Sequence, residues 1–97
     1  MQTYLGLLQW TKEGVAKIKD SPSRLDAAKK AFESAGGKIN SFFMLMGQYD
    51  AAIIAEAPDD ATMARVTLAL ASRGGIRTVT HRAFTEDEYR KIISSIP

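Results

Sequence analysis

The chain has 97 residues, of which 45% are hydrophobic and 25% are charged, and it contains no cysteine. This balance indicates a folded domain, and the lack of cysteine excludes disulfides, thiolate nucleophiles and cysteine-ligated metals. The 13 lysines and arginines against 11 acidic residues leave a formal net charge of only +2, spread along the chain, which does not favour nucleic-acid binding.

The sequence carries no sign of export or of membrane insertion. Residues 1–8 lack the basic stretch and the cleavable apolar segment of a signal peptide, and no apolar run approaches the ~20 residues that span a bilayer. We therefore expect a cytoplasmic protein without a membrane partner. We also expect residues 1–97 to form one α+β domain.

The first half of the chain predicts a strand, a helix and a second strand. Residues 3–10 form an apolar run typical of a strand, and residues 11–20 predict a loop with one helical turn. Ser21-Pro22 predicts a helix start, with Ser as the capping residue and Pro at the first helical position. The glycine pair at 36–37 ends this helix, and residues 38–46 predict the second strand.

The second half of the chain predicts the same elements in the same order, followed by a short final helix. A tight hairpin at Gly47–Asp50 leads into a third strand over residues 51–56. Pro58-Asp59-Asp60 opens the second helix, because acidic residues favour the positive end of a helix. Residues 76–84 predict the fourth strand, and a capping box at Thr85–Glu88 starts a short final helix.

The order β-α-β-β-α-β with a terminal helix predicts an α+β fold of the ferredoxin-like type. In each half, a pair of glycines joins a helix to a strand, which indicates two related half-units. Right-handed crossovers would place both main helices on one face of a four-stranded antiparallel sheet.

The predicted strands are apolar on both faces, although two helices can cover only one. On the first strand Leu5 and Leu7 oppose Tyr4, Leu8 and Trp10, and on the second Ile39, Phe43 and Leu45 oppose Phe42, Met44 and Met46. The uncovered face would be an interaction surface, and its simplest cover is the same face of a second copy, which gives a dimeric α+β barrel. The alternative is that the terminal helix folds back over this face. Its apolar side carries Tyr89, Ile92, Ile93 and Ile96.

The hairpin motif Gly47-Gln48-Tyr49-Asp50 is accompanied by other short segments of characteristic sequence. These are Thr11–Gly14, Ile18–Arg24, Glu56–Asp60, and Arg77–Thr80 followed by Ala83–Thr85. Together they make the chain resemble the GYD domain family of small bacterial proteins over nearly its whole length. The resemblance implies a dimeric α+β barrel and no particular activity, since none is established for the family.

Two residues are candidates for catalysis. His81 is the only histidine, and its side chain normally titrates near neutral pH, so it could act as a general acid or base in a pocket within the dimer. Tyr49 could orient a substrate at the hairpin. The alternative for each is structural, with His81 exposed or hydrogen-bonded and Tyr49 packed in the turn.

Four further residues are candidates for ligand binding. Trp10 could line a pocket, Asp50 could orient a ligand, Arg24 near a helix start could hold a carboxylate or phosphate, and Arg77 lies on the fourth strand. The alternatives are core or interface packing for Trp10, turn chemistry for Asp50, and for Arg24 an ion pair with Asp20 or exposure to solvent.

Motifs for nucleotides and metals are absent. Gly37-Lys38-Ile39 lacks the features of a P-loop, no G-x-G-x-x-G occurs, and His81 has no second ligand at metal-binding spacing. We therefore expect no cofactor and no metal. RNA-binding domains of this strand order display aromatic side chains on their third strand, and residues 51–55 carry none.

Three functions remain open. We favour a dimeric α+β-barrel protein that binds a small, largely apolar ligand in a pocket beside the sheet. The first alternative is an interaction module whose sheet face serves only self-assembly. The second is a cofactor-free enzyme of the oxygenase or isomerase type, by fold analogy alone, with His81 as base and Tyr49 orienting the substrate. In each case the expected partner is a second copy of the chain, as a homodimer or a higher homo-oligomer.

Overall fold

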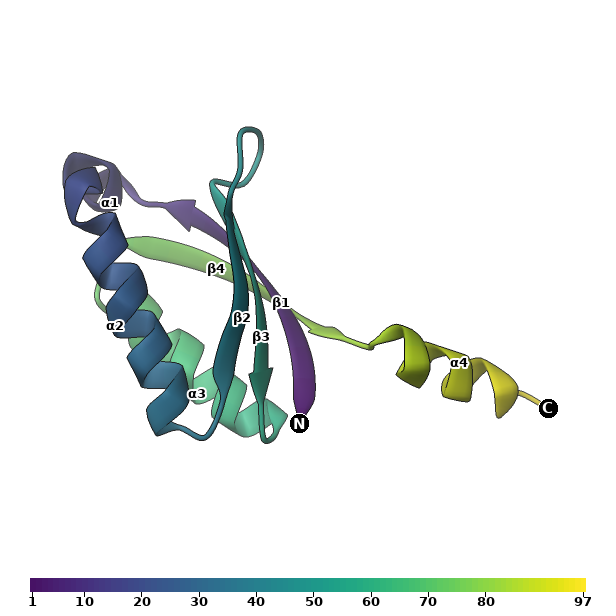
Figure 1. The fold of residues 1–97 in the computed structure, drawn as a ribbon. Helices are drawn as coiled ribbons and strands as arrows, with labels where there is room; N and C mark the ends of the chain where they lie inside the picture. The colour runs from purple at the N-terminus through teal and green to yellow at the C-terminus, as the bar shows by residue number, and fades with distance from the viewer.

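The computed structural model describes residues 1–97 and contains a four-stranded sheet with its two main helices on one side (Figure 1). The strands are β1 (Gln2–Trp10), β2 (Lys38–Met44), β3 (Ala51–Ala57) and β4 (Ile76–Ala83). The helices are α1 (Lys12–Ala16), the 3₁₀ helix η1 (Ile18–Asp20), α2 (Ser21–Ser34), α3 (Asp60–Ala71) and α4 (Glu86–Ser94).

The strands lie in the order β2-β3-β1-β4, and each neighbouring pair is antiparallel. Both α2 and α3 lie on the same face of the sheet, as right-handed crossovers require (Figure 1). The predicted ferredoxin-like α+β fold with a C-terminal helix is therefore confirmed. None of the helices combines the length and the hydrophobicity needed to cross a bilayer.

The start of α2 differs from the sequence prediction. Ser21 is the first residue of the helix instead of its cap, and Asp20 occupies the capping position with helical backbone angles. The carboxylate of Asp20 accepts no hydrogen bond there, because the chain enters α2 directly from η1. No side chain caps the start of α2; the Ser21 N–H donates to the Ile18 carbonyl oxygen, and Pro22 has no N–H.

The connection between β2 and β3 is longer than the tight hairpin that the sequence predicts. Strand β2 ends at Met44, and residues 45–50 form a loop closed by a 2.8 Å hydrogen bond from Leu45 N–H to the Asp50 carbonyl oxygen. The Asp50 N–H donates to the Leu8 carbonyl oxygen at 2.8 Å, which fixes the loop against the end of β1.

A β-bulge changes which side chains of β2 share a face. The register with β3 shifts between Ile39 and Ser41, so Asn40 is the extra residue. Ile39 and Phe42 consequently both pack against the core on the helix-covered side. The sequence-based placement of Ile39 on the same face as Phe43 is wrong for this reason.

The core lies between the sheet and the two main helices. The largest fully buried side chains are Phe32 of α2 and Met63 of α3, and burying each contributes about 1.5–3 kcal/mol. The complete buried cluster is Tyr4, Phe32, Ile53, Ala55, Ala57, Met63 and Val66. The small alanines Ala55 and Ala57 of β3 are almost completely buried in this cluster.

No helix covers the opposite face of the sheet (Figure 1). The large apolar side chains on this side are Leu5, Leu7, Phe43, Ile54 and Val79, which we call the open face. Ile54 lies opposite Leu5 in the strand register and Val79 lies opposite Leu7, so the open face is continuous across the central strands. Phe43 at one side of it is 58% exposed.

The C-terminal helix α4 stands off the rest of the molecule (Figure 1). Its apolar side chains, Tyr89, Ile92, Ile93 and Ile96, are all exposed. The radius of gyration is 14.6 Å, against about 12.5 Å for a compact domain of this length. The chain is therefore extended, and α4 does not fold back to cover the open face of its own chain.

Candidate functional site

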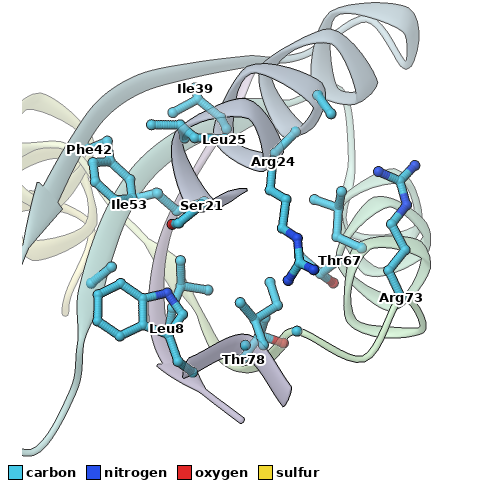
Figure 2. Close-up of a pocket in the computed structure, with 18 of the residues that line it drawn as sticks. Leu8, Ser21, Arg24, Leu25, Ile39, Phe42, Ile53, Thr67, Arg73 and Thr78 are labelled. Carbon is cyan, nitrogen blue, oxygen red and sulfur yellow. The ribbon is translucent and has the colours of Figure 1, made fainter. Parts of the chain in front are cut away.

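A cavity of about 340 Å³ lies between α2, the helix-covered face of the sheet and the connection from α3 to β4 (Figure 2). Most of its lining is apolar, with Leu8 and Trp10 from β1, Leu25 from α2, Phe42 from β2 and Ile53 from β3. The volume falls at the lower end of the range for small-molecule sites, roughly 300–1,000 Å³. The cavity is therefore large enough to hold a small organic molecule.

Polar side chains border the cavity on one side. Arg24 of α2 extends its guanidinium into the space between the helices, toward Thr78 of β4 (Figure 2). Arg73 lies at the edge and its guanidinium points away from that of Arg24 (Figure 2). Ser21 lies at the start of α2, and no acidic residue or lysine contributes to the lining. The polar side of the cavity is therefore positively charged.

A junction between α1 and the α3–β4 connection fixes the backbone beside Arg24. The Thr11 N–H donates to the Gly75 carbonyl oxygen at 3.2 Å, and the Thr11 hydroxyl donates to the Gly74 carbonyl oxygen at 2.7 Å. A methyl group at Gly14 would lie 2.1 Å from the same Gly75 oxygen, so only glycine permits this approach of α1. The short helix α1, which the sequence predicts as one helical turn within a loop, thus anchors the edge of the cavity.

The comparison with known proteins assigns the chain to a family. The model of the GYD domain matches residues 4–93. The chain belongs to the GYD domain family. The resemblance predicted from the hairpin motif and its accompanying segments is therefore confirmed.

One relative of this GYD domain is the "Glutamine synthetase and cystathionine beta-lyase binding protein" of Thermus thermophilus. The two chains are 33% identical over 84 residues, which cover 86% of this chain and 88% of the relative. A crystal structure of a protein from Thermus thermophilus matches with a TM-score of 0.55 at 22% identity, covering 88% of this chain and 95% of that chain. At this level of identity, the structural match supports the α+β fold alone.

Within the GYD domain, Asp50 fixes the end of β1. Its carboxylate Oδ2 accepts a hydrogen bond of 2.9 Å from the Trp10 N–H. The Gln9 side chain donates to the Gln48 carbonyl oxygen at 3.0 Å, so the hairpin loop holds the segment that bears Trp10 at two points. Tyr49 is half-buried in this loop, makes no side-chain hydrogen bond and does not line the cavity.

His81 and Arg77 lie on the other side of the sheet from the cavity. In the register of β4, His81 lies opposite Leu5 and Arg77 lies opposite Gln9, and both side chains are exposed. The structure therefore brings Trp10 and Arg24 together in one cavity and separates both from His81 and Arg77.

Sequence reasoning missed Arg73 and Thr78, which also line the cavity. The available signal was the glycine pair at 74–75, because such a pair marks a close approach of the backbone to another element. Arg73 directly precedes that pair, and Thr78 shares its face of β4 with Ile76.

Tyr4 is the buried side chain whose titration is most altered, and it lies outside the cavity lining. Its hydroxyl donates a hydrogen bond of 2.5 Å to Oδ1 of Asp60, the first residue of α3. Burial, and after it the hydrogen bond to Asp60, raises the pKa of Tyr4 to about 12. Since this pair ties the buried Tyr4 of β1 to Asp60 at the exposed start of α3, its role in the fold is structural.

Proposed function

We propose that this GYD domain is a self-assembling interaction module that pairs with a second copy through the open face. The observation that carries the proposal is the continuous row of large apolar side chains left without cover after α2 and α3 pack on the other face. A contiguous apolar patch on a small protein marks an interaction surface. A two-fold axis brings identical patches together, so one surface can serve as both partners.

Helix α4 supports the same proposal. Its exposed apolar residues recur at helical spacing and form one stripe, and the rest of its own chain offers no surface that covers it. Arg82 of β4 lies 3.9 Å from Glu88 at the start of α4, which ties the helix to the domain only at that end. In the proposed pair, the stripe of each copy packs on the other copy.

We further propose that the assembled module binds enzymes. The support is the relative named as a binding protein of glutamine synthetase and cystathionine beta-lyase, which aligns with 86% of this chain. The candidate partners are therefore the corresponding two enzymes of the organism that encodes this chain. Biolayer interferometry with each purified enzyme tests this part of the proposal separately from self-assembly.

The assembly proposal is tested by a charge placed on the open face. Val79→Asp adds a carboxylate on the open face, where its desolvation in the proposed interface is costly, while the monomer leaves this position accessible to water. We expect the parent chain to have the mass of a dimer and the variant that of a folded monomer. Size-exclusion chromatography with light scattering measures the mass, and circular dichroism verifies the fold.

The matched control is Leu68→Asp on α3, because Leu68 is 70% exposed on the helix side of the molecule. This variant should remain a dimer. A parent chain that is monomeric at ~100 μM would contradict the proposal, as would a Val79→Asp variant that keeps the dimer mass.

A second function, binding of a small and largely apolar ligand, is supported by the cavity beside α2 (Figure 2). The cavity is on the helix-covered side of the sheet, so a ligand there and a second copy on the open face do not compete. Catalysis is no part of this proposal, because His81 and Tyr49 both lie outside the cavity lining.

A further inference from the structure

Arg24 is a charged side chain without a partner inside the protein. It forms neither an ion pair nor a hydrogen bond with any residue, and in particular it does not pair with Asp20. Its guanidinium nevertheless projects into the cavity and does not turn out along the surface of α2 (Figure 2). The donors of the guanidinium fork are therefore available to a molecule in the cavity.

The backbone beside Arg24 is shaped to receive its guanidinium. A methyl group at Gly75 would lie 2.3 Å from Arg24 Nη1, so a side chain at this position would displace the guanidinium. Gly75 is itself held by the hydrogen bond from the Thr11 N–H. The direction of Arg24 into the cavity thus depends on a glycine that the surrounding structure fixes in place.

The surroundings of Arg24 favour an anion. No acidic side chain lines the cavity to neutralise the guanidinium. The start of α2, where Ser21 borders the cavity, is the positive end of the helix dipole and adds potential of the same sign. The hydroxyls of Ser21 and Thr78 also border the cavity and donate no hydrogen bond to the protein. An entering anion would meet the Arg24 guanidinium and these two hydroxyls, with no competing carboxylate in the lining.

The rest of the cavity favours an apolar group. Leu8, Trp10, Leu25, Phe42 and Ile53 form a wall that can exclude water from a hydrocarbon chain or an aromatic ring. A small inorganic anion would leave this wall empty, and a neutral hydrocarbon would leave Arg24 unpaired. A ligand with one charged end and one apolar end satisfies both parts of the cavity.

We infer that the cavity binds a small amphipathic carboxylate, with the carboxylate on Arg24 and the apolar part against Trp10 and Phe42. This inference rests on the ligand-binding function proposed above. A carboxylate is favoured over a phosphate because a single guanidinium enters the cavity and no lysine lines it, and one planar fork matches the two oxygens of a carboxylate.

Trp10 provides the measurement, because it is the only tryptophan of the chain and lines the cavity. The probes are octanoate and octanamide, which differ in charge and hardly in shape. We expect octanoate to change the fluorescence of Trp10 and to bind at least about ten-fold more tightly than octanamide, as a charge-assisted hydrogen bond of about 1.5–3 kcal/mol requires. Isothermal titration calorimetry gives the affinities independently.

The informative variant is Arg24→Met, which keeps a long side chain and removes the charge. It should bind octanoate and octanamide with similar affinity, while its affinity for octanamide stays that of the parent chain. The matched control is Arg65→Met on α3, because Arg65 is also exposed on a helix but does not line the cavity. This control should retain the preference of the parent for octanoate.

The possible results separate the two proposals. If octanoate and octanamide bind the parent equally well, or if Arg24→Met keeps the preference for octanoate, the carboxylate inference is wrong and the ligand-binding function stands. Tighter binding of octyl phosphate than of octanoate would also overturn it. If no probe binds at millimolar concentration, both the inference and the ligand-binding function are wrong. The self-assembly proposal is unaffected by this result, because it is tested separately by the mass of the protein in solution.

Discussion

At the scale of single residues, Tyr4 connects the stability of the fold to pH. Folding favours its neutral hydroxyl, because the pKa rises from 10.0 to about 12 through burial and the hydrogen bond to Asp60. A group with a raised pKa in the folded state contributes its full stabilisation below its unfolded pKa. That stabilisation is lost as the pH rises through the folded pKa, so the affected window runs from pH 10.0 to about 12.

The variant Tyr4→Phe tests this connection. We expect it to lower the free energy of unfolding by about 1–2 kcal/mol at neutral pH, because a partly buried hydrogen bond to a carboxylate is lost. Its stability should also fall less steeply than that of the parent in the alkaline window. Urea unfolding followed by circular dichroism at a series of pH values measures both effects.

The control for Tyr4 is Tyr89→Phe, since Tyr89 is exposed on α4. This change should leave the unfolding curves unchanged. Equal alkaline destabilisation of the parent and Tyr4→Phe would show that another group causes the loss.

The sequence could indicate some of the cavity residues and not others. Trp10 and Arg24 were suggested by residue type and by position at a strand end and a helix start, and the structure places both in one cavity. Their proximity depends on how η1 enters α2 and on the junction at Gly75, which residue type alone does not encode. The roles proposed for His81 and Tyr49 came from residue chemistry alone, and the folded chain places neither at the cavity.

At the scale of elements, α4 is the helix with the fewest ties to its own domain. The sequence predicts it well, because the capping box of Thr85 and Glu88 forms as expected, with hydrogen bonds of 2.9 and 3.2 Å. The direction of α4 could not be predicted. An apolar stripe shows that one side of a helix packs against another surface, but it does not show which surface that is. The exposed stripe therefore points to an intermolecular role.

Deleting residues 85–97 tests the role of α4. The sheet and the two main helices should stay folded, because the stripe makes no contribution to the buried core. The proposed pair should weaken by at least about ten-fold in its dissociation constant, since several exposed apolar side chains lose their cover. Sedimentation equilibrium measures this constant.

A point variant separates the stripe from the length of the chain. Ile93→Ser should weaken the pair, whereas Lys91→Ser on the same helix should not. If the shortened chain unfolds, α4 contributes to the domain itself and its proposed place on the second copy is wrong.

For the strands, as for α4, the sequence pattern predicts that the element exists but not every detail of its geometry. All four were predicted, since apolar runs bounded by glycines and acidic turns are strong local signals. The bulge at Asn40 was not predicted, because one extra residue in a strand leaves no mark on an apolar run. It altered the face of Ile39 while leaving the conclusion about an uncovered face intact.

At the scale of the whole molecule, the chain has little interior for its length. Only 11 of its 97 residues are buried, and several large apolar side chains remain exposed on the open face and on α4. A domain of this size gains modest stability from its own core, so the proposed association would add a substantial share. The stability of this protein is therefore expected to depend on its concentration.

Thermal unfolding across a concentration series tests this expectation. The Tm of the parent should rise as the concentration increases from ~10 to ~500 μM, because mass action favours the folded pair. The Tm of Val79→Asp should be lower and constant over the same range. A parent Tm that does not change with concentration would mean that the isolated chain is the stable form.

The bulge in β2 also bears on how far association can proceed. Strand β2 is an edge strand of the sheet. The unpaired N–H and C=O groups of an edge strand can pair with a strand of another chain and so extend the sheet from one molecule to the next. The extra residue at Asn40 increases the twist of this edge strand and interrupts the regular hydrogen-bonding pattern that an added strand would need. On the β2 side, growth along the hydrogen-bonding direction is thereby discouraged, which favours the proposed face-to-face pair over a sheet extended from this edge.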